Sequence, residues 1–157
     1  MISPFIKPRA LDGSQIKAAS EFHGHSGPFL VLGLRMGQLA LRLLDARGYF
    51  DLRCVVKVRW SPPQSCIIDG IQFSTGCTMG KRNIEIIEQG EGIAAVFSDG
   101  EKSLRIQVKS SVLRLISRAL RIGTAERLIE DLLSAADDEL FDYQMRCEEA
   151  PSKDLKS

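Results

Sequence analysis

The sequence has almost no excess of charge and no long apolar run. Of its 157 residues, 21 are basic and 20 are acidic, so the formal net charge is +1. A balanced charge offers no basic surface for nucleic acid or for an anionic membrane, and we expect neither as a partner. The longest apolar run, residues 28–34, is far shorter than the roughly 20 residues of a membrane-spanning helix. Residues 1–8 lack the pattern of a secretory signal, so we expect a cytoplasmic protein.

The sequence also lacks any Cys-x-x-Cys pair. Its cysteines are Cys54, Cys66, Cys77 and Cys147. This spacing is not that of a secreted disulfide framework, so reduced thiols are expected, each either a small core residue or a functional thiolate. Cys54 alternates inside a strand-like segment, which favours core packing, whereas the glycines around Cys77 favour function. Cys66 fits either role, and Cys147 stands near the end of the chain.

The length is typical of one domain, which can bury a core without disulfides or metal. Hydrophobic periodicity and turn residues predict helices over residues 12–22, 28–46, 65–73, 111–121 and 125–146, and strands over residues 54–60, 83–87, 92–97 and 104–108. The order helix–helix–strand–helix–strand–strand–strand–helix–helix predicts an α+β fold. We expect a single domain over residues 1–147, with helices packed on a mixed or antiparallel sheet of about four strands. Residues 148–157 are polar and are expected to be a disordered tail.

Small residues line one face of the second predicted helix. Gly33, Gly37 and Ala40 lie opposite a polar stripe that includes Arg35 and Arg42. A face of small residues lets another element approach closely. We expect that element to be the sheet.

Both histidines of the chain lie in the segment 22–28, Phe-His-Gly-His-Ser-Gly-Pro. A loop with Gly24 as its pivot would aim His23 and His25 at one point, just before a helix N-terminus that favours an anion or a thiolate. Imidazole binds metals and carries protons near neutral pH. The alternative interpretation is that both are capping or surface histidines.

A second polar segment, residues 65–83, places thiols, hydroxyls, an amide, an acid and a lysine around a glycine-rich turn. It is not a Walker phosphate loop, because only three residues separate Gly76 from Gly80-Lys81 and a strand follows. A helix from Cys66 to residue 75 would separate its ends by about 13 Å. If Cys66 and Cys77 share a metal, the chain must therefore fold back after Gly76, or the ligands must come from two subunits. Ser-His-Asp hydrolysis is disfavoured, since no Gly-x-Ser-x-Gly is present.

Together the two segments resemble the E-subunit family of formylmethanofuran dehydrogenase, over about residues 15–110. Its members are similar in having Phe-His-Gly-His-x-Cys-Pro-Gly at the start of a helix. A Cys-containing Asp-x-Ile-Gln segment and Thr-Gly-Cys-Thr-x-Gly-Lys-x-Asn follow. The matching residues here are Phe22, His23, Gly24, His25, Pro28, Cys66, Asp69, Ile71, Gln72, Thr75, Gly76, Cys77, Thr78, Gly80, Lys81 and Asn83. One departure is that Gly27 replaces the family cysteine and Phe29 its following glycine, which excludes redox chemistry by that cysteine.

The resemblance implies an α+β core that forms an intertwined homodimer. It also implies association with the tungsten or molybdenum enzyme that fixes carbon dioxide onto methanofuran, whose catalytic metal centre belongs to other subunits. Some members carry a C-terminal zinc finger, for which only Cys147 remains here.

We therefore expect a metal-binding accessory protein of one-carbon metabolism, possessing a site for zinc or another divalent transition metal. Its expected ligands are His23, Cys66 and Cys77, with His25 as a fourth ligand or as a partner of one. The neighbouring pocket would hold an anionic or amide-bearing ligand and be lined by Asp69, Gln72, Thr78, Lys81 and Asn83. One alternative is a stand-alone enzyme in which a histidine activates Cys77 as nucleophile. The other is a scaffold subunit of a larger oxidoreductase, with a vestigial pocket.

Overall fold

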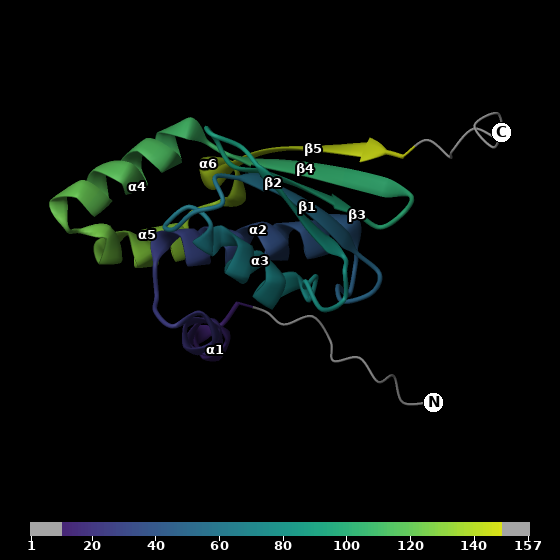
Figure 1. Cartoon of the computed structure of the whole chain (residues 1–157), viewed down its shortest axis with the longest axis horizontal. Coiled ribbons are helices and arrows are strands. Elements are labelled where there is room, and N and C mark those ends of the chain that lie inside the picture. The colour runs from purple at the N-terminus through teal and green to yellow at the C-terminus, as the bar shows by residue number, and fades with distance from the viewer. Residues whose placement is uncertain (1–10, 149–157) are drawn as a thin grey trace.

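The computed structural model describes residues 11–148. It contains one five-stranded sheet with helices packed on one face (Figure 1). The helices are α1 (Gly13–His23), α2 (Pro28–Leu44), α3 (Cys66–Thr75), α4 (Ser110–Ile122), α5 (Leu128–Ser134) and α6 (Asp137–Leu140), with a 3₁₀ turn η1 (Ala125–Arg127) before α5. The strands are β1 (Arg53–Val58), β2 (Ile84–Glu88), β3 (Ala94–Ser98), β4 (Lys102–Val108) and β5 (Phe141–Cys147). The predicted tail lies outside the described residues, apart from residue 148.

The sheet is mixed and has the strand order β2-β1-β3-β4-β5. β1 and β2 run parallel and are connected through α3, whereas the other neighbouring strands are antiparallel. In β1 the residues Cys54, Val56 and Val58 are buried, and Val55 and Lys57 between them are half-buried. This alternation is typical of a strand with one face on the core. The predicted α+β fold is confirmed, with five strands rather than about four.

The fifth strand corrects the prediction of one helix over residues 125–146. The helical part ends at Ser134, a short α6 follows, and Phe141–Cys147 pairs antiparallel with β4. Phe141, Tyr143 and Met145 lie opposite Val108, Ile106 and Leu104, which are the buried residues of β4. This alternation has the period of a strand, whereas the helix prediction rested on the spacing of three residues between Leu140 and Tyr143. The open edge of β4, which needs hydrogen-bond partners, decides between them.

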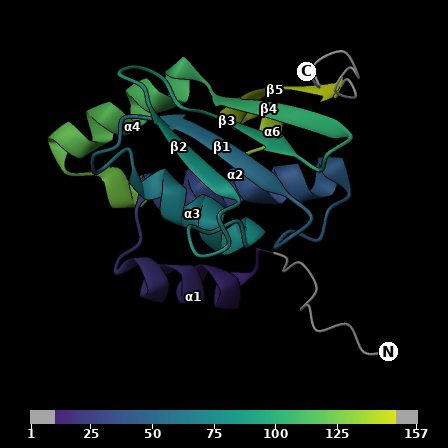
Figure 2. The ribbon, with the colours of Figure 1, turned by 45° about the vertical axis from the view of Figure 1, so that its right-hand side comes forward.

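The first three helices form two successive layers beneath the sheet. Figures 1 and 2 show α2 and α3 directly under the strands and α1 on the far side of α3. The main core lies between the sheet and the first layer. A smaller cluster of Ala19, Leu30 and Leu34, with Phe73 packed against it, joins α1 to α2 and α3. This cluster fixes the end of α1, where the histidines lie.

The small-residue face of α2 packs against α3, not against the sheet as we expected. A Cβ at Gly33 would lie 2.9 Å from the Gly70 Cα of α3, and closer still to the Ile67 carbonyl oxygen. A Cβ at Gly37 would lie 2.9 Å from Thr75 Cγ2. Because α3 carries its own glycine opposite Gly33, the two backbones come almost into contact. This close crossing sets the position of α3 relative to the chain before α2.

The polar stripe of α2 also has a structural role. Arg35 is almost buried, and its guanidinium donates to the carbonyl oxygens of Leu132 and Ala135, both at 2.6 Å, and of Leu133 at 3.1 Å. These bonds satisfy carbonyls at the C-terminal end of α5, which have no partner within that helix.

Even α2, buried along most of its length, is not long and apolar enough to cross a membrane, and neither is any other helix of residues 11–148.

Candidate functional site

The loop between α1 and α2 brings the two histidines together. α1 ends at His23, and Gly24 adopts a left-handed φ of 108° while its N–H donates to the Ser20 carbonyl at 2.7 Å. This backbone conformation favours glycine and turns the chain sharply. The ring centroids of His23 and His25 consequently lie 4.7 Å apart, edge to face. Pro28 then begins α2.

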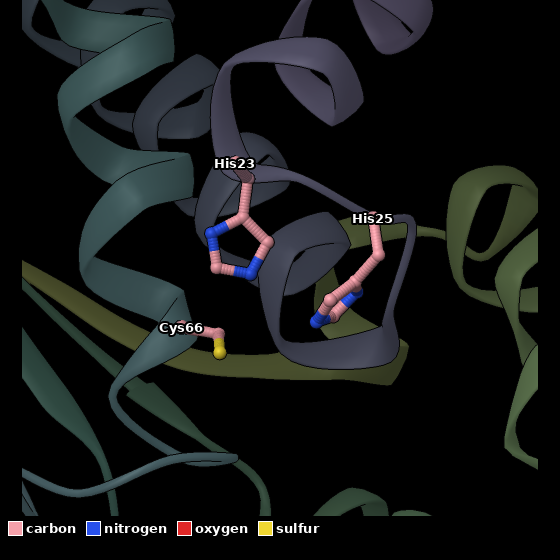
Figure 3. Close-up of side chains that lie close together, drawn as sticks. All are labelled: His23, His25 and Cys66. Atoms are coloured by element: carbon pink, nitrogen blue, oxygen red, sulfur yellow. The ribbon is translucent and has the colours of Figure 1, made fainter.

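Cys66, the first residue of α3, completes a cluster with the two histidines (Figure 3). One ligand atom from each of His23, His25 and Cys66 lies within 4.8 Å of the other two. Atoms bound to one zinc are about 3–4 Å apart, because each lies about 2.0–2.3 Å from the ion. A contraction of about 1 Å therefore suffices to bring three donors of suitable chemistry onto one metal.

Asp69, one turn after Cys66 on α3, orients the His23 ring. Its Oδ2 lies 2.5 Å from His23 Nδ1. With the carboxylate ionised, Nδ1 carries the proton and donates it to this bond, so that the Nε2 lone pair is free. Nε2 is buried and is the one buried side-chain nitrogen or oxygen atom of residues 11–148 without a hydrogen-bond partner. An unpaired buried atom of this kind is costly unless a ligand or an ion binds it.

Cys66 is half-buried and lies at the N-terminus of a helix. Burial raises the pKa of its thiol, and the nearby charge of Asp69 raises it further. These effects work against a free thiolate nucleophile, whereas a bound metal would supply the positive charge that a thiolate needs.

Gly27 is buried and lies beside the His25 ring of the cluster. A Cβ at this position would lie 3.1 Å from His25 Cε1 and 3.3 Å from His25 Nδ1. The backbone of Gly27 is extended, with φ −149° and ψ 163°, a conformation that any residue adopts. The cysteine that the family pattern places here would therefore stand beside His25. Its absence leaves three donors in the cluster instead of four.

Cys77 does not join the cluster. It is fully buried in the main core, and its thiol donates to the Leu52 carbonyl at 3.4 Å. Burial raises the pKa of this thiol. The chain does turn after α3, at Gly76 with a left-handed φ of 74°, but the turn directs Cys77 into the core. Cys66 and Cys77 are left at opposite ends of the ten-residue helix.

Some of the expected pocket residues line surface hollows, whereas Asn83 is buried and bonds to the backbone. Gln72 lines hollows on both sides of the 79–80 turn, and its Oε1 accepts a bond from the Met79 N–H at 3.2 Å. Thr78 lines one hollow, and Lys81 Nζ donates to Thr78 Oγ1 at 3.1 Å. Asn83 is buried and bonds to the backbone instead: its amide donates to the carbonyls of Tyr49 and Leu52, and its Oδ1 accepts from the Thr78 N–H. Asn83 thus supports the turn from behind.

Two hollows adjoin each other through Gln72 and Met79, and the smaller one contains part of the cluster. Their apolar lining was not anticipated. The larger, of about 430 Å³, is lined by residues that include Phe22, Tyr49 and Phe73. The smaller, of about 320 Å³, contains His23, Cys66 and Asp69 and is bordered by Trp60. Aromatic residues make up only 6% of the sequence, so their gathering near the two motifs was the signal that could have revealed these walls.

Comparison with known proteins gives the family. The family described as "FmdE, Molybdenum formylmethanofuran dehydrogenase operon" matches residues 22–142, from the first residue of the histidine motif to β5. The chain belongs to the FmdE family. This confirms the resemblance and extends it beyond residue 110 into the C-terminal helices.

Two known proteins resemble this FmdE chain, one in sequence and the other in fold. The chain is 31% identical over 103 residues to a protein of Archaeoglobus fulgidus named "Probable S-adenosyl-L-methionine-binding protein". The match covers 61% of the chain but only 27% of that relative. A tungsten formylmethanofuran dehydrogenase FmdE-like protein from Syntrophus aciditrophicus has a similar fold, with a TM-score of 0.65 over 97% of the chain and 81% of that protein. Its sequence identity is 19%, so this likeness concerns the fold alone.

Proposed function

We propose that this FmdE protein binds a divalent transition metal, zinc above all, through His23, His25 and Cys66. The observation that carries the proposal is the buried and unpaired His23 Nε2, which belongs to a residue whose other nitrogen is held by Asp69. A carboxylate that orients a metal-binding imidazole in this way is a recurrent feature of zinc sites. Two imidazoles and a thiolate are a donor set that zinc accepts readily.

Three protein donors give the site a particular chemical character. Structural zinc sites have four protein ligands, whereas sites with three leave a position for water or for a ligand. The ion would supply Lewis acidity at that position. His25 is exposed, Cys66 is half-buried, and the smaller hollow borders the cluster, so a small molecule can approach from that side. The proposed site is thus suited to binding a ligand as well as to stabilising the fold.

In the cell, we propose, the protein is an accessory subunit linked to formylmethanofuran dehydrogenase or to related one-carbon metabolism. The family match supports this role. A homodimer and a cytoplasmic location are part of the same proposal. The buried position of Cys77 favours this proposal over the enzyme in which Cys77 acts as nucleophile, since the thiol donates to a backbone carbonyl and not to an imidazole.

Elemental analysis of untagged protein tests the metal site. Wild type should contain near-stoichiometric metal, or accept zinc after chelation, and both Cys66→Ala and His25→Ala should lose it. Cys77→Ala is the matched control, because it removes a thiol that is buried in the core and should leave the metal content unchanged. A wild type that cannot be loaded with zinc would refute the proposal. Equal loss of metal from Cys77→Ala would refute the ligand set.

A further inference from the structure

The larger hollow lies apart from the proposed metal ligands, and the metal site does not account for it. Its volume of about 430 Å³ is within the range of small-molecule sites. None of His23, His25 and Cys66 lines it. We call it the aromatic hollow, after the rings of Phe22, Tyr49 and Phe73.

The aromatic hollow keeps apolar side chains exposed at its rim. Phe22 is 61% exposed and Met79 58% exposed. The ring of Phe22 lies 6.3 Å from that of Phe73, at an angle of 37°. The ring of Tyr49 packs against Gly76, where a Cβ would lie 2.9 Å from Tyr49 Cε1. Exposed rings around a concave surface are a frequent mark of a site that binds another flat, apolar group.

Among the described residues, Arg47 is the one charged residue that lines the aromatic hollow. The nearby carboxylate of Asp51 accepts from the backbone N–H of Arg47 at 3.0 Å and is not part of the lining. Lys81 Nζ lies 5.9 Å from the centroid of the Tyr49 ring, which forms one of the walls. A negatively charged group at this edge would face two cations with no competing carboxylate in the lining.

We infer that the aromatic hollow binds a small molecule in which a planar aromatic ring is joined to an anionic group such as a phosphate or a carboxylate. The ring stacks among Phe22, Tyr49 and Phe73, and the anion faces Arg47 and Lys81. Gln72 and Met79 line both hollows, so the bound ligand lies next to the cluster of His23, His25 and Cys66. The inference does not depend on the metal, because no proposed metal ligand forms the aromatic hollow.

Adenosine 5′-monophosphate is a suitable probe, titrated into ¹⁵N-labelled full-length protein and followed by the backbone amide signals. We expect saturable shifts of the amides of Phe22, Gly76 and Gly80, with weaker binding of adenosine and no comparable shifts from inorganic phosphate. Phe22→Ala should weaken the binding of the nucleotide by about fivefold or more, through the lost stacking. Because Phe22 is largely exposed, this variant should retain the amide spectrum of the folded protein.

Tyr143→Ala is the matched control, since it removes an exposed aromatic residue on β5, outside the aromatic hollow. Unmoved amides with the nucleotide, or equal affinity in Phe22→Ala and wild type, would overturn the inference. Shifts produced equally by phosphate alone would overturn the role of the ring, and adenosine binding as tightly as the nucleotide would overturn that of the anion. The titration is repeated on metal-free His25→Ala protein. Intact binding there would show that failure of the metal site leaves this inference standing.

Discussion

Replacing Gly27 by cysteine should strengthen zinc binding. The new Cβ would stand 3.1 Å from His25 Cε1, and the extended backbone at Gly27 accepts a side chain without strain. His25 is exposed and has room to shift by the few tenths of an ångström that this contact requires. Gly27→Cys would thus add a fourth donor to the three already present.

The size of the effect follows from the affinity of complete zinc sites. Four-ligand sites in zinc-finger peptides bind with about 10–16 kcal/mol, or about 2.5–4 kcal/mol for each ligand. Because part of this is lost to imperfect geometry, we expect Gly27→Cys to gain about 2–3 kcal/mol, a decrease in zinc Kd of about 30- to 150-fold.

Competition with a chromophoric zinc chelator measures the Kd, with Gly27→Ser as the control of similar size. Cobalt substitution provides a second readout, because a second thiolate ligand should intensify the thiolate-to-metal absorption. If Gly27→Cys and Gly27→Ser bind zinc with equal Kd while both remain folded, the introduced thiol does not reach the metal and the cluster is not where zinc binds.

Four further outcomes are expected. Asp69→Asn should weaken zinc binding by about 10- to 100-fold, because His23 loses the partner that orients it, as measured by the same competition assay. Gly33→Ala should reduce the free energy of unfolding by about 1–3 kcal/mol in urea titrations, because the new methyl group forces α2 and α3 apart. In metal-free native protein, Cys77 should react with iodoacetamide more slowly than free cysteine, as followed by peptide mass mapping, because it is buried and its pKa is raised. Asp99→Ala should destabilise the β3–β4 turn by about 0.5–1.5 kcal/mol at pH 7, and this difference should narrow in urea titrations as the pH falls below 3.8.

The sign of the last effect follows from the folded state. Backbone N–H groups of Lys102 and Glu101 donate to Asp99 and lower its pKa from the ordinary value of 3.8. The stabilisation is therefore complete above that value and is lost as the pH falls through the lower, folded-state pKa. A difference that grows on acidification would contradict it.

The other three expectations have their own controls. Glu85→Gln, an exposed acid in β2, should not change zinc binding. Gly13→Ala adds a methyl group with no atom within 4 Å and should not destabilise the protein, so equal stability of Gly33→Ala and Gly13→Ala would contradict the close crossing. Exposed Cys147 should react with iodoacetamide readily, and a Cys77 as fast as Cys147 would revive the nucleophile hypothesis.

Local sequence signals predicted most of the fold. The helices predicted over residues 12–22 and 28–46 correspond to α1, which Asp12 caps by accepting from the Gln15 N–H at 3.0 Å, and to α2, which begins at Pro28. The segment of β5 was predicted wrongly because Leu140 and Tyr143, three residues apart, continue the helical spacing of the residues before them. The strand with which β5 pairs lies more than 30 residues earlier in the chain. The contact between Gly33 and Gly70 could not be predicted either, because it depends on how α3 crosses α2 in the folded protein.

The candidate site shows the same division. The histidine motif is local, so its geometry followed from Gly24. The glycine before Cys77 invited a functional interpretation, but Gly76 ends α3 and accommodates the Tyr49 ring. Asp69 was expected to line a pocket, and its contact with His23 depends on how α1 and α3 pack together. Tertiary contacts of this kind have no signature in residue spacing.

The positions of the cluster in the chain have a consequence for folding. His23 and His25 precede α2, while Cys66 follows β1, so one ion held by all three would close a loop of about 40 residues. In the entropy model of loop closure, such a cross-link lowers the conformational entropy of the unfolded chain and so raises its free energy by about 4 kcal/mol. The loop contains both α2, the centre of the core, and β1, a central strand of the sheet. In cells that lack the metal, the free energy of unfolding of this protein would be smaller. Its abundance would therefore follow the metal supply.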